Sequence, residues 1–405
     1  MGRTGAMKKL RAIATALFLS ATCIATGKVG AQNSSIGRQA DPSPAVIKMR
    51  QQWLNGDINS FTFRDNDRMF PVRAVRHSGA VWALPHAAGF TMPAGYQDFA
   101  EKTYTNAFLV IRDGKILFED YRNRSHAGTK FIAFSMSKSI VSMLTGIALQ
   151  KGLIASIDDP VTKYVPELKG GGYDGVSIRH ILEMRSGVDY EERYDFGANP
   201  SPAAVNHEVA IVENKRRFAD SAKTIGKKWE PGSRFNYATI DTAVLGWMLE
   251  RATKQPLAQF MQANIWAPLG AEADGYWLAD GPSGVGRELA GMGFNATLRD
   301  FGRLGMMMLN GGKRGSTQIV PTAWLKQATT MMPTGSPIAP GYGLQFWQLD
   351  NEPGAYAALG LAGQFIYVHP ATRTVIVKLS YFPQPEPPEL MPEILRYFKT
   401  ITSQH

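Results

Sequence analysis

Ser135 and Lys138 form the only Ser-x-x-Lys sequence in this 405-residue chain. The apolar stretch at 140–149 follows at once and ends before Gly152, which predicts a buried helix with the glycine just past its C-terminus. Ser135 would then begin the helix, and Lys138 would lie one turn further along the same face. A serine hydroxyl is a weak nucleophile until a base removes its proton, and a desolvated lysine can be that base. The pair therefore predicts acyl-transfer chemistry, and the alternative is a helix cap followed by a solvated lysine.

A second candidate group is Tyr237, within the segment 231–239 and ahead of an expected helix around Ala243. A phenol near an ammonium group can have its pKa lowered and can then carry protons between nucleophile and leaving group. Tyr237 could do this. The alternative is a buried tyrosine whose hydroxyl group is satisfied by ordinary hydrogen bonds.

A third candidate group is the glycine-rich segment 360–364, Gly-Leu-Ala-Gly-Gln, which opens an expected strand. Small residues let a strand edge approach a substrate closely, and one backbone N–H group there could complete an oxyanion hole. The alternative is a turn between two strands.

In this order and spacing, the three groups resemble the serine β-lactamase and penicillin-binding-protein superfamily. The likeness is closest to its class C-related esterase and amidase branch, which contains the family VIII esterases and the 6-aminohexanoate-dimer hydrolases. It extends from about Asn106 to Phe398. Besides Ser135 and Lys138, it rests on the segments 181–188, 231–246, 275–277, 293–300 and 342–347.

The resemblance implies a set of site residues and a mechanism. Ser135 would be the nucleophile, Lys138 its base and Tyr237 the proton carrier in an acyl-enzyme reaction. The backbone N–H groups of Ser135 and Gln364 would form the oxyanion hole.

Several further residues are pocket candidates. Tyr190 and Tyr194 follow the Ser186-Gly187 turn and would line the pocket, as their counterparts do in amide-cleaving relatives; ordinary packing is the alternative. Asn295 lies in a matched segment and is also a pocket candidate. Leu361 and Gly363, from the third group, complete the expected lining.

Two departures from the superfamily pattern bear on specificity. Thr239 stands where Tyr-x-Asn or Ser-x-Asn sequences end in asparagine, and Leu361-Ala362-Gly363 stands where Lys-Thr-Gly or His-x-Gly is usual. The cation or imidazole that would hold a substrate carboxylate is thus a leucine. We therefore expect a preference for neutral, short acyl esters or amides and poor turnover of penicillins.

The elements that must position these residues follow from periodicity. Two apolar runs around Asp113-Gly114 predict a hairpin over 108–121, and strands are expected at 342–347, 364–368 and 374–379. Between them, residues 150–310 look mainly helical, with helices expected near 177–187, at 243–249 and from 297 to 310. This order predicts an α+β protein of the β-lactamase/DD-peptidase type. Its antiparallel sheet would be built from both chain ends and flanked by helices, with a mainly helical region inserted.

The N-terminus has the order of a secretory signal peptide: basic residues, a short apolar stretch and a small-residue cleavage site after Ala31. A retained membrane anchor is the alternative, although the apolar stretch is short for a span. We expect a signal peptide over 1–31, a mostly irregular arm over 32–95 and a hydrolase domain over 96–405. The protein would be periplasmic or secreted, with no stable membrane insertion once the signal peptide is removed.

Composition excludes several classes of function. The formal charge is +10, but residues 1–31 hold five basic and no acidic residues, which leaves +5 on the mature chain. Its basic residues are dispersed, so nucleic-acid binding is not expected. The sole cysteine, Cys23, lies in the signal segment, which excludes disulfides and thiol catalysis in the mature chain. No His-x-His or His-Glu-x-x-His spacing occurs, so we expect no metal and no cofactor.

These patterns predict a secreted serine hydrolase that cleaves a small-molecule ester or linear amide. One alternative is a penicillin-interacting protein, either a DD-peptidase or a weak β-lactamase. Another is a non-catalytic binding protein on the same fold.

Overall fold

The computed structural model describes residues 42–404, except 195–196, 282–284, 338 and 351. The expected signal peptide lies outside these residues, as does the start of the expected arm. Across the described part of the chain, none of the helices combines the length and the apolar character that a membrane span requires.

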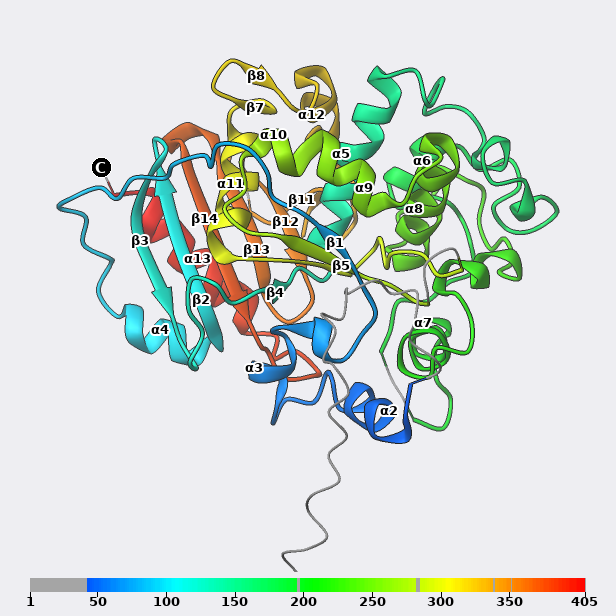
Figure 1. Ribbon diagram of the computed structural model, residues 1–405, viewed down its shortest axis with the longest axis horizontal. Coiled ribbons are helices and arrows are strands. Elements are labelled where there is room, and N and C mark those ends of the chain that lie inside the picture. The colour runs from blue at the N-terminus through cyan, green and yellow to red at the C-terminus, as the bar shows by residue number, and fades with distance from the viewer. Residues whose placement is uncertain (1–41, 195–196, 282–284, 338, 351, 405) are drawn as a thin grey trace, which may run out of the picture. The chain divides into compact units, whose positions relative to one another are not determined.

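The main sheet of the described residues has eight antiparallel strands, drawn from the two ends of the chain as expected (Figure 1). The hairpin expected over 108–121 is β2 and β3, and the strands expected at 364–368 and 374–379 are β13 and β14. In spatial order the strands are β3 (Lys115–Tyr121), β2 (Thr105–Arg112), β14 (Thr374–Ser380), β13 (Gln364–His369), β12 (Tyr356–Gly360), β11 (Trp347–Gln348), β10 (Gly341–Tyr342) and β9 (Met332–Pro333).

Helices cover both faces of this sheet because alternate strand residues point to opposite sides. On β13, Phe365 and Tyr367 face α13 (Leu390–Thr402), where their rings lie 5.6 Å and 5.4 Å from the ring of Phe398. Ile366 faces α11 (Leu298–Leu309), which carries Gly305 at the contact. A Cβ atom on Gly305 would lie 2.9 Å from Ile366, so this glycine lets the helix approach the sheet. Figure 1 shows α11 and α13 on opposite faces.

A second, smaller sheet leads the chain into Ser135. It contains four antiparallel strands within the described residues: β1 (Val72–Val75), β5 (Gly275–Leu278), β6 (Phe294–Ala296) and β4 (Phe131–Ile132). Strand β4 ends three residues before Ser135. The sequence did not predict this sheet, because its strands are short and their partners are distant in sequence.

The remaining α- and π-helices lie, for the most part, between β3 and β9 in the sequence. They are α2 (Pro44–Gln51), α3 (Asn59–Thr62), α4 (Tyr96–Lys102), α5 (Met136–Gln150), α6 (Ile178–Leu182), α7 (Pro202–Asn206), the π-helix η5 (His207–Val212), α8 (Thr239–Thr253), α9 (Leu257–Met261), the π-helix η7 (Gln262–Trp266), α10 (Ala267–Leu269) and α12 (Thr322–Ala328); a small hairpin joins β7 (Lys313–Arg314) to β8 (Thr317–Gln318).

The helix expected after Ser135 is α5, and it ends as the sequence indicates. Gly152 has a φ of +69°, and its N–H group bonds the carbonyl of Leu149. The N–H of Leu153 bonds the carbonyl of Ala148, which completes a Schellman motif.

The prediction of one strand over 342–347 is wrong. Two short strands, β10 and β11, pair with each other there around a tight turn. Gln345 in this turn has a φ of +69° and a fully buried side chain. Its amide donates to the carbonyl of Leu182 and accepts from the hydroxyl of Thr242. These partners are distant in sequence, so periodicity could not reveal the turn.

Two other expectations need adjustment. The arm over 32–95 contains α2, α3 and β1 besides irregular segments. The helix capped by Ser177 is α6, which ends at Leu182 rather than near Gly187, and Met184 beyond it has a positive φ of 55°. The domain boundary near residue 96 stays a prediction.

Candidate active site

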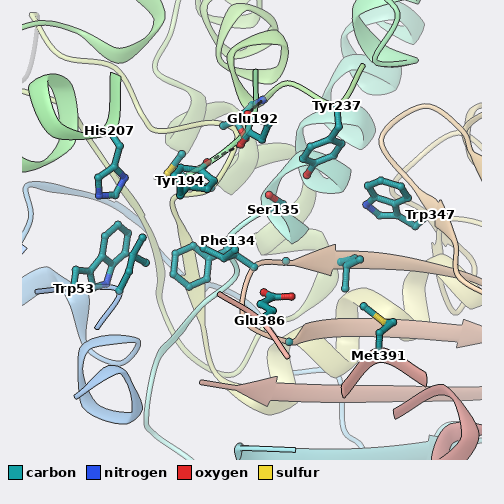
Figure 2. Close-up of a pocket in the computed structure, with 17 residues that line it drawn as sticks. Trp53, Phe134, Ser135, Glu192, Tyr194, His207, Tyr237, Trp347, Glu386 and Met391 are labelled. Atoms are coloured by element: carbon teal, nitrogen blue, oxygen red, sulfur yellow. Dashed lines mark hydrogen bonds between the residues drawn. The ribbon is translucent and has the colours of Figure 1, made fainter. Parts of the chain in front are cut away.

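Ser135 lies at the turn that joins β4 to α5 (Figure 2). The preceding residue, Phe134, has a φ of +42°, a conformation that costs energy for a residue with a bulky side chain. Its ring is held by Phe63 and Trp53, with centroid distances of 4.8 Å and 5.4 Å. The side chain of Ser135 makes no capping hydrogen bond to α5, so its hydroxyl group is left for other partners.

Lys138 is 1% exposed, and its ammonium nitrogen lies 2.7 Å from Ser135 Oγ. The same nitrogen lies 3.0 Å from Thr239 Oγ1 and 2.9 Å from the carbonyl oxygen of Gly291. The alternative of a helix cap followed by a solvated lysine does not fit this arrangement. Ser135 and Lys138 are in hydrogen-bond contact inside the protein.

The hydrogen-bond partners of Thr239 determine how Lys138 is oriented. The Thr239 hydroxyl lies 2.6 Å from Glu192 Oε1, and its backbone N–H donates to Glu192 Oε2 at 2.7 Å. Because a carboxylate only accepts, the Thr239 hydroxyl donates to Glu192 and accepts from Lys138. The Gly291 carbonyl also only accepts. A neutral Lys138 amine has two N–H donors for these two acceptors, and its lone pair then faces Ser135.

Burial lowers the pKa of Lys138 to about 8, while the negative charges of Glu192 and Asp241 act in the opposite direction. A lowered pKa is what a lysine base requires, since the amine must be neutral to accept a proton. The sequence predicts this direction, and burial is its cause.

Tyr237 lies beside the pair, with the nitrogen of Lys138 4.9 Å from the centre of its ring. The ring packs against Trp347 and Tyr342 at centroid distances of 5.3 Å and 6.2 Å. The prediction that the nearby ammonium group lowers the pKa of Tyr237 is wrong. Burial raises the pKa, and the hydrogen bond with Ser135, which lowers it, is the smaller effect. Tyr237 is therefore a protonated phenol at neutral pH, with a proton available for transfer.

The second expected oxyanion donor, Gln364, does not line the cavity beside Ser135. Its side chain is buried and bonds the backbone of Ser380 and the turn before β13. Gly360, at the end of β12, is the residue that reaches the nucleophile: a Cβ atom there would lie 3.2 Å from the Ser135 nitrogen. The next N–H group belongs to Leu361, which lines the cavity. Glycine at 360 is what allows this approach.

The cavity has a volume of about 270 Å³ and opens beside Ser135. Of the expected pocket residues, Tyr194, Leu361 and Gly363 line it, whereas Tyr190 and Asn295 do not. Asn295 is fully buried in β6, where it accepts from Asn66 and donates to the carbonyl of Gly293. The lining is Trp53, Leu54, Phe134, Ser135, Glu192, Tyr194, His207, Tyr237, Thr239, Met292, Trp347, Leu359, Gly360, Leu361, Gly363, Glu386 and Met391.

The ionisable groups of the lining are mainly acidic. Glu192 and Glu386 line this cavity, whereas none of the described residues that line it is Lys or Arg. Glu386 accepts from the N–H of Ala362, in the turn that carries Leu361. Burial lowers the pKa of His207 to about 4, so its ring is neutral.

The sequence did not identify Glu192, Gly291 or Trp53 as site residues. Glu192 stands two residues before Tyr194, and no pattern relates it to Thr239, 47 residues on. Trp53 comes from the N-terminal arm, and only its aromatic character in a polar segment could have suggested burial. No group of three or more potential metal ligands is found among the described residues.

Sequence comparison identifies the family of this chain and its relatives. A family model described as Beta-lactamase matches residues 94–396. The 6-aminohexanoate-dimer hydrolase of Paenarthrobacter ureafaciens is 31% identical over 357 residues, which cover 82% of this chain and 88% of that protein. Esterase EstB of Burkholderia gladioli is 30% identical over 189 residues, which cover 42% of this chain and 47% of that protein.

Solved structures share the fold at lower identity. A protein from Bacillus anthracis assigned as a 6-aminohexanoate-dimer hydrolase superposes with a TM-score of 0.76 at 21% identity, covering 91% of this chain and 96% of that one. EstCE1, a hydrolase with promiscuous acyltransferase activity, superposes with a TM-score of 0.58 at 18% identity, covering 75% of this chain and 96% of that one.

Proposed function

This chain belongs to the β-lactamase family and is a hydrolase, and we propose that it cleaves neutral ester or linear amide bonds through an acyl-serine intermediate on Ser135. The observation that carries the proposal is the buried Lys138 amine, whose partners leave its lone pair facing the Ser135 hydroxyl. A hydroxyl group so paired is an activated nucleophile.

In the first half of the reaction, neutral Lys138 takes the proton of Ser135 as the oxygen attacks the substrate carbonyl carbon. The oxyanion that forms accepts hydrogen bonds from the N–H groups of Ser135 and Leu361. We favour Leu361 over Gln364 because Leu361 lines the cavity directly after Gly360. Such donors stabilise charge that develops only in the transition state.

The tetrahedral intermediate then collapses. Tyr237 gives its proton to the leaving alcohol or amine and is reprotonated by the Lys138 ammonium group. Water then attacks the acyl-serine and gives a proton to neutral Lys138. The Lys138 ammonium group passes this proton to Ser135 Oγ as the acyl–oxygen bond breaks, so the acid product leaves and both residues return to their starting states. The raised pKa of Tyr237 means that the phenol still holds its proton when the leaving group needs it.

The lining of the cavity supports a neutral substrate. Leu361 offers a substrate carboxylate no partner, and Glu192 and Glu386 would repel it. Burying an unpaired anion is costly even after the protein relaxes. The named activities of the two relatives, hydrolysis of a 6-aminohexanoate dimer and of esters, fit an amide or ester bond.

We also propose that the protein works outside the cytoplasm, in a periplasm or after secretion. The support is the signal-peptide pattern of residues 1–31. N-terminal sequencing of the protein from its native host should begin at Gln32. An intact Met1 on the purified protein would contradict the proposal.

Labelling with a fluorophosphonate probe tests the nucleophile. The wild-type protein should gain the probe mass at Ser135, and Ser135→Ala should gain none. Ser142→Ala is a matched control, since Ser142 lies on the same helix, is buried and has no hydrogen-bond partner among the described residues. Labelling of Ser135→Ala would disprove the assignment, and a wild-type protein that never reacts would favour a non-catalytic binding protein.

A further inference from the structure

A second cavity lies beside the first, and we propose that it binds the distal part of an elongated apolar acyl group. Its volume is about 550 Å³, and it lies among α2, α7 and η5. Most of the side chains that form its wall are apolar, including Leu54, Ala204, Val205, Val209 and Val212. The proposal deepens the proposed function, on which it rests, by naming the class of substrate.

Hydrogen bonds join the two walls of this cavity, which are α2 and η5. Buried Arg50 at the end of α2 donates to the carbonyls of Ile211 and Val212 at the end of η5, both at 3.4 Å. Gln51 donates to Glu208 at 3.1 Å, and both residues line the cavity. The N-terminal arm and η5 are thereby held at a fixed spacing. Because Val205 is 39% exposed, the cavity is also accessible from the surface.

The two cavities are adjacent, because they share two wall residues. Leu54 and His207 line both of them. His207 stacks on Trp53 with a centroid distance of 6.1 Å, and its neutral ring places no charge at the junction. In our proposal, an acyl chain that starts at Ser135 passes Trp53 and reaches the second cavity beside His207.

The position of Tyr237 indicates which half of the substrate takes this path. In Figure 2, Tyr237 and Trp347 lie on one side of Ser135, and Trp53 and His207 lie on the other. The leaving group must be next to its proton donor, Tyr237. Because the acyl and leaving groups extend from the carbonyl carbon in different directions, the acyl group points toward Trp53 and His207. This proposal replaces the preference for short acyl groups that we expect from the sequence.

The acyl-chain dependence of turnover tests the proposal. With p-nitrophenyl butyrate, octanoate and decanoate, each further buried methylene group should raise the wild-type kcat/KM by up to about fourfold. Val205→Trp should fill the cavity from the surface. We expect it to lower kcat/KM for the decanoate at least tenfold and to leave the butyrate value within twofold. Val209→Phe, at another position of the cavity wall, should also lower kcat/KM for the decanoate and leave the butyrate value within twofold.

Val81→Trp is the matched control, because Val81 is 45% exposed and lines neither cavity. A decanoate-to-butyrate ratio that both cavity variants leave at the wild-type value would overturn the proposal. If no ester is turned over at all, the proposed function fails, and calorimetric titration with n-decanol still tests the cavity without chemistry. Weaker decanol binding by Val205→Trp than by wild type supports it, and equal or absent binding overturns it.

Discussion

In the proposed mechanism, the reactivity of Ser135 depends on the direction of three hydrogen bonds. These are the bonds from Lys138 to Thr239 and Gly291 and the bond from Thr239 to Glu192. Glu192 can only accept, so the Thr239 hydroxyl donates to it and accepts from Lys138. Thr239 can therefore orient Lys138, but only because the Glu192 carboxylate accepts its hydroxyl proton. A threonine in the place of the asparagine of Tyr-x-Asn still provides a hydrogen-bond partner for Lys138.

The protonation of Lys138 should govern the pH dependence of activity. Its pKa of about 8 means that the neutral base becomes scarcer as pH falls. We expect kcat/KM for p-nitrophenyl butyrate to rise with pH to half its plateau near pH 8 and to be about a hundredfold below the plateau at pH 6. Lys138→Arg should lose about 10²- to 10⁴-fold of the rate, because arginine stays protonated.

Lys151→Arg is the control for this prediction, since Lys151 is exposed at the other end of α5. It should keep the wild-type rate and pH profile. A pH-independent wild-type rate between pH 6 and 9, or an active Lys138→Arg enzyme, would rule out Lys138 as the base.

The proton carried by Tyr237 should matter most for poor leaving groups. Tyr237→Phe should slow cleavage of an amide by about 10²-fold or more and that of a p-nitrophenyl ester by far less, because nitrophenolate leaves without a proton. Initial rates on the two substrates measure this split. Tyr342→Phe, in the same aromatic cluster, should show no split. Equal losses on both substrates in Tyr237→Phe would indicate a packing role.

At the scale of elements, the central strand β14 carries a second buried lysine that the reaction does not use. Lys378 is fully buried, and its nitrogen donates to the carbonyl of Thr103 at 2.7 Å and to the hydroxyl of Ser380. No salt bridge joins it to a carboxylate of the described residues. Burial lowers its pKa well below the usual value.

This lysine should make the stability of the fold depend on pH. Because the folded-state pKa is lowered, the unfolded chain binds more protons between that pKa and about 10.4, and the free energy of unfolding rises with pH in this window. The slope contributed by one such lysine is at most about 1.4 kcal/mol per pH unit. Lys378→Met should flatten the slope, as measured by urea unfolding between pH 7 and 10.

Lys115→Met, on the exposed start of β3, should leave the slope as it is in the wild type. Buried Lys138 adds a slope of the same sign above pH 8, so Lys378→Met should reduce the dependence without abolishing it. A slope unchanged in Lys378→Met would mean that this amine stays protonated in the folded protein over this pH range, which would contradict the lowered pKa.

At the scale of the whole molecule, net charge and site charge have opposite signs. The chain has a formal charge of +10, yet the cavity beside Ser135 is lined by two glutamates and by neither Lys nor Arg among the described residues. Net charge therefore does not predict the sign of the substrate. The local charges that line the cavity do.

The charge of the preferred substrate should distinguish an esterase or amidase from a β-lactamase. We expect kcat/KM for p-nitrophenyl butyrate to exceed that for the carboxylated substrate nitrocefin, because the anion meets Glu192, Glu386 and an apolar Leu361. Leu361→His should shift the ratio toward nitrocefin, and Leu361→Met is its size-matched control. Faster wild-type turnover of nitrocefin would favour a penicillin-interacting enzyme.

The sequence by itself determined the elements that local patterns encode. The Asp113-Gly114 hairpin, the helix after Ser135 with its stop at Gly152, and strands β13 and β14 follow from periodicity and turn chemistry. The placing of Ser135 and Lys138 in hydrogen-bond contact also follows, because residues three apart share a helix face. The family followed from motif order.

The tertiary structure decided what depends on contacts between distant residues. Glu192 meets Thr239, Gly360 meets the Ser135 backbone, and Trp53 reaches the cavity from the N-terminal arm. No local pattern encodes these contacts. The pKa of Tyr237 shows the same limit, since burial, a property of the folded molecule, outweighed the nearby charge from which its direction was predicted.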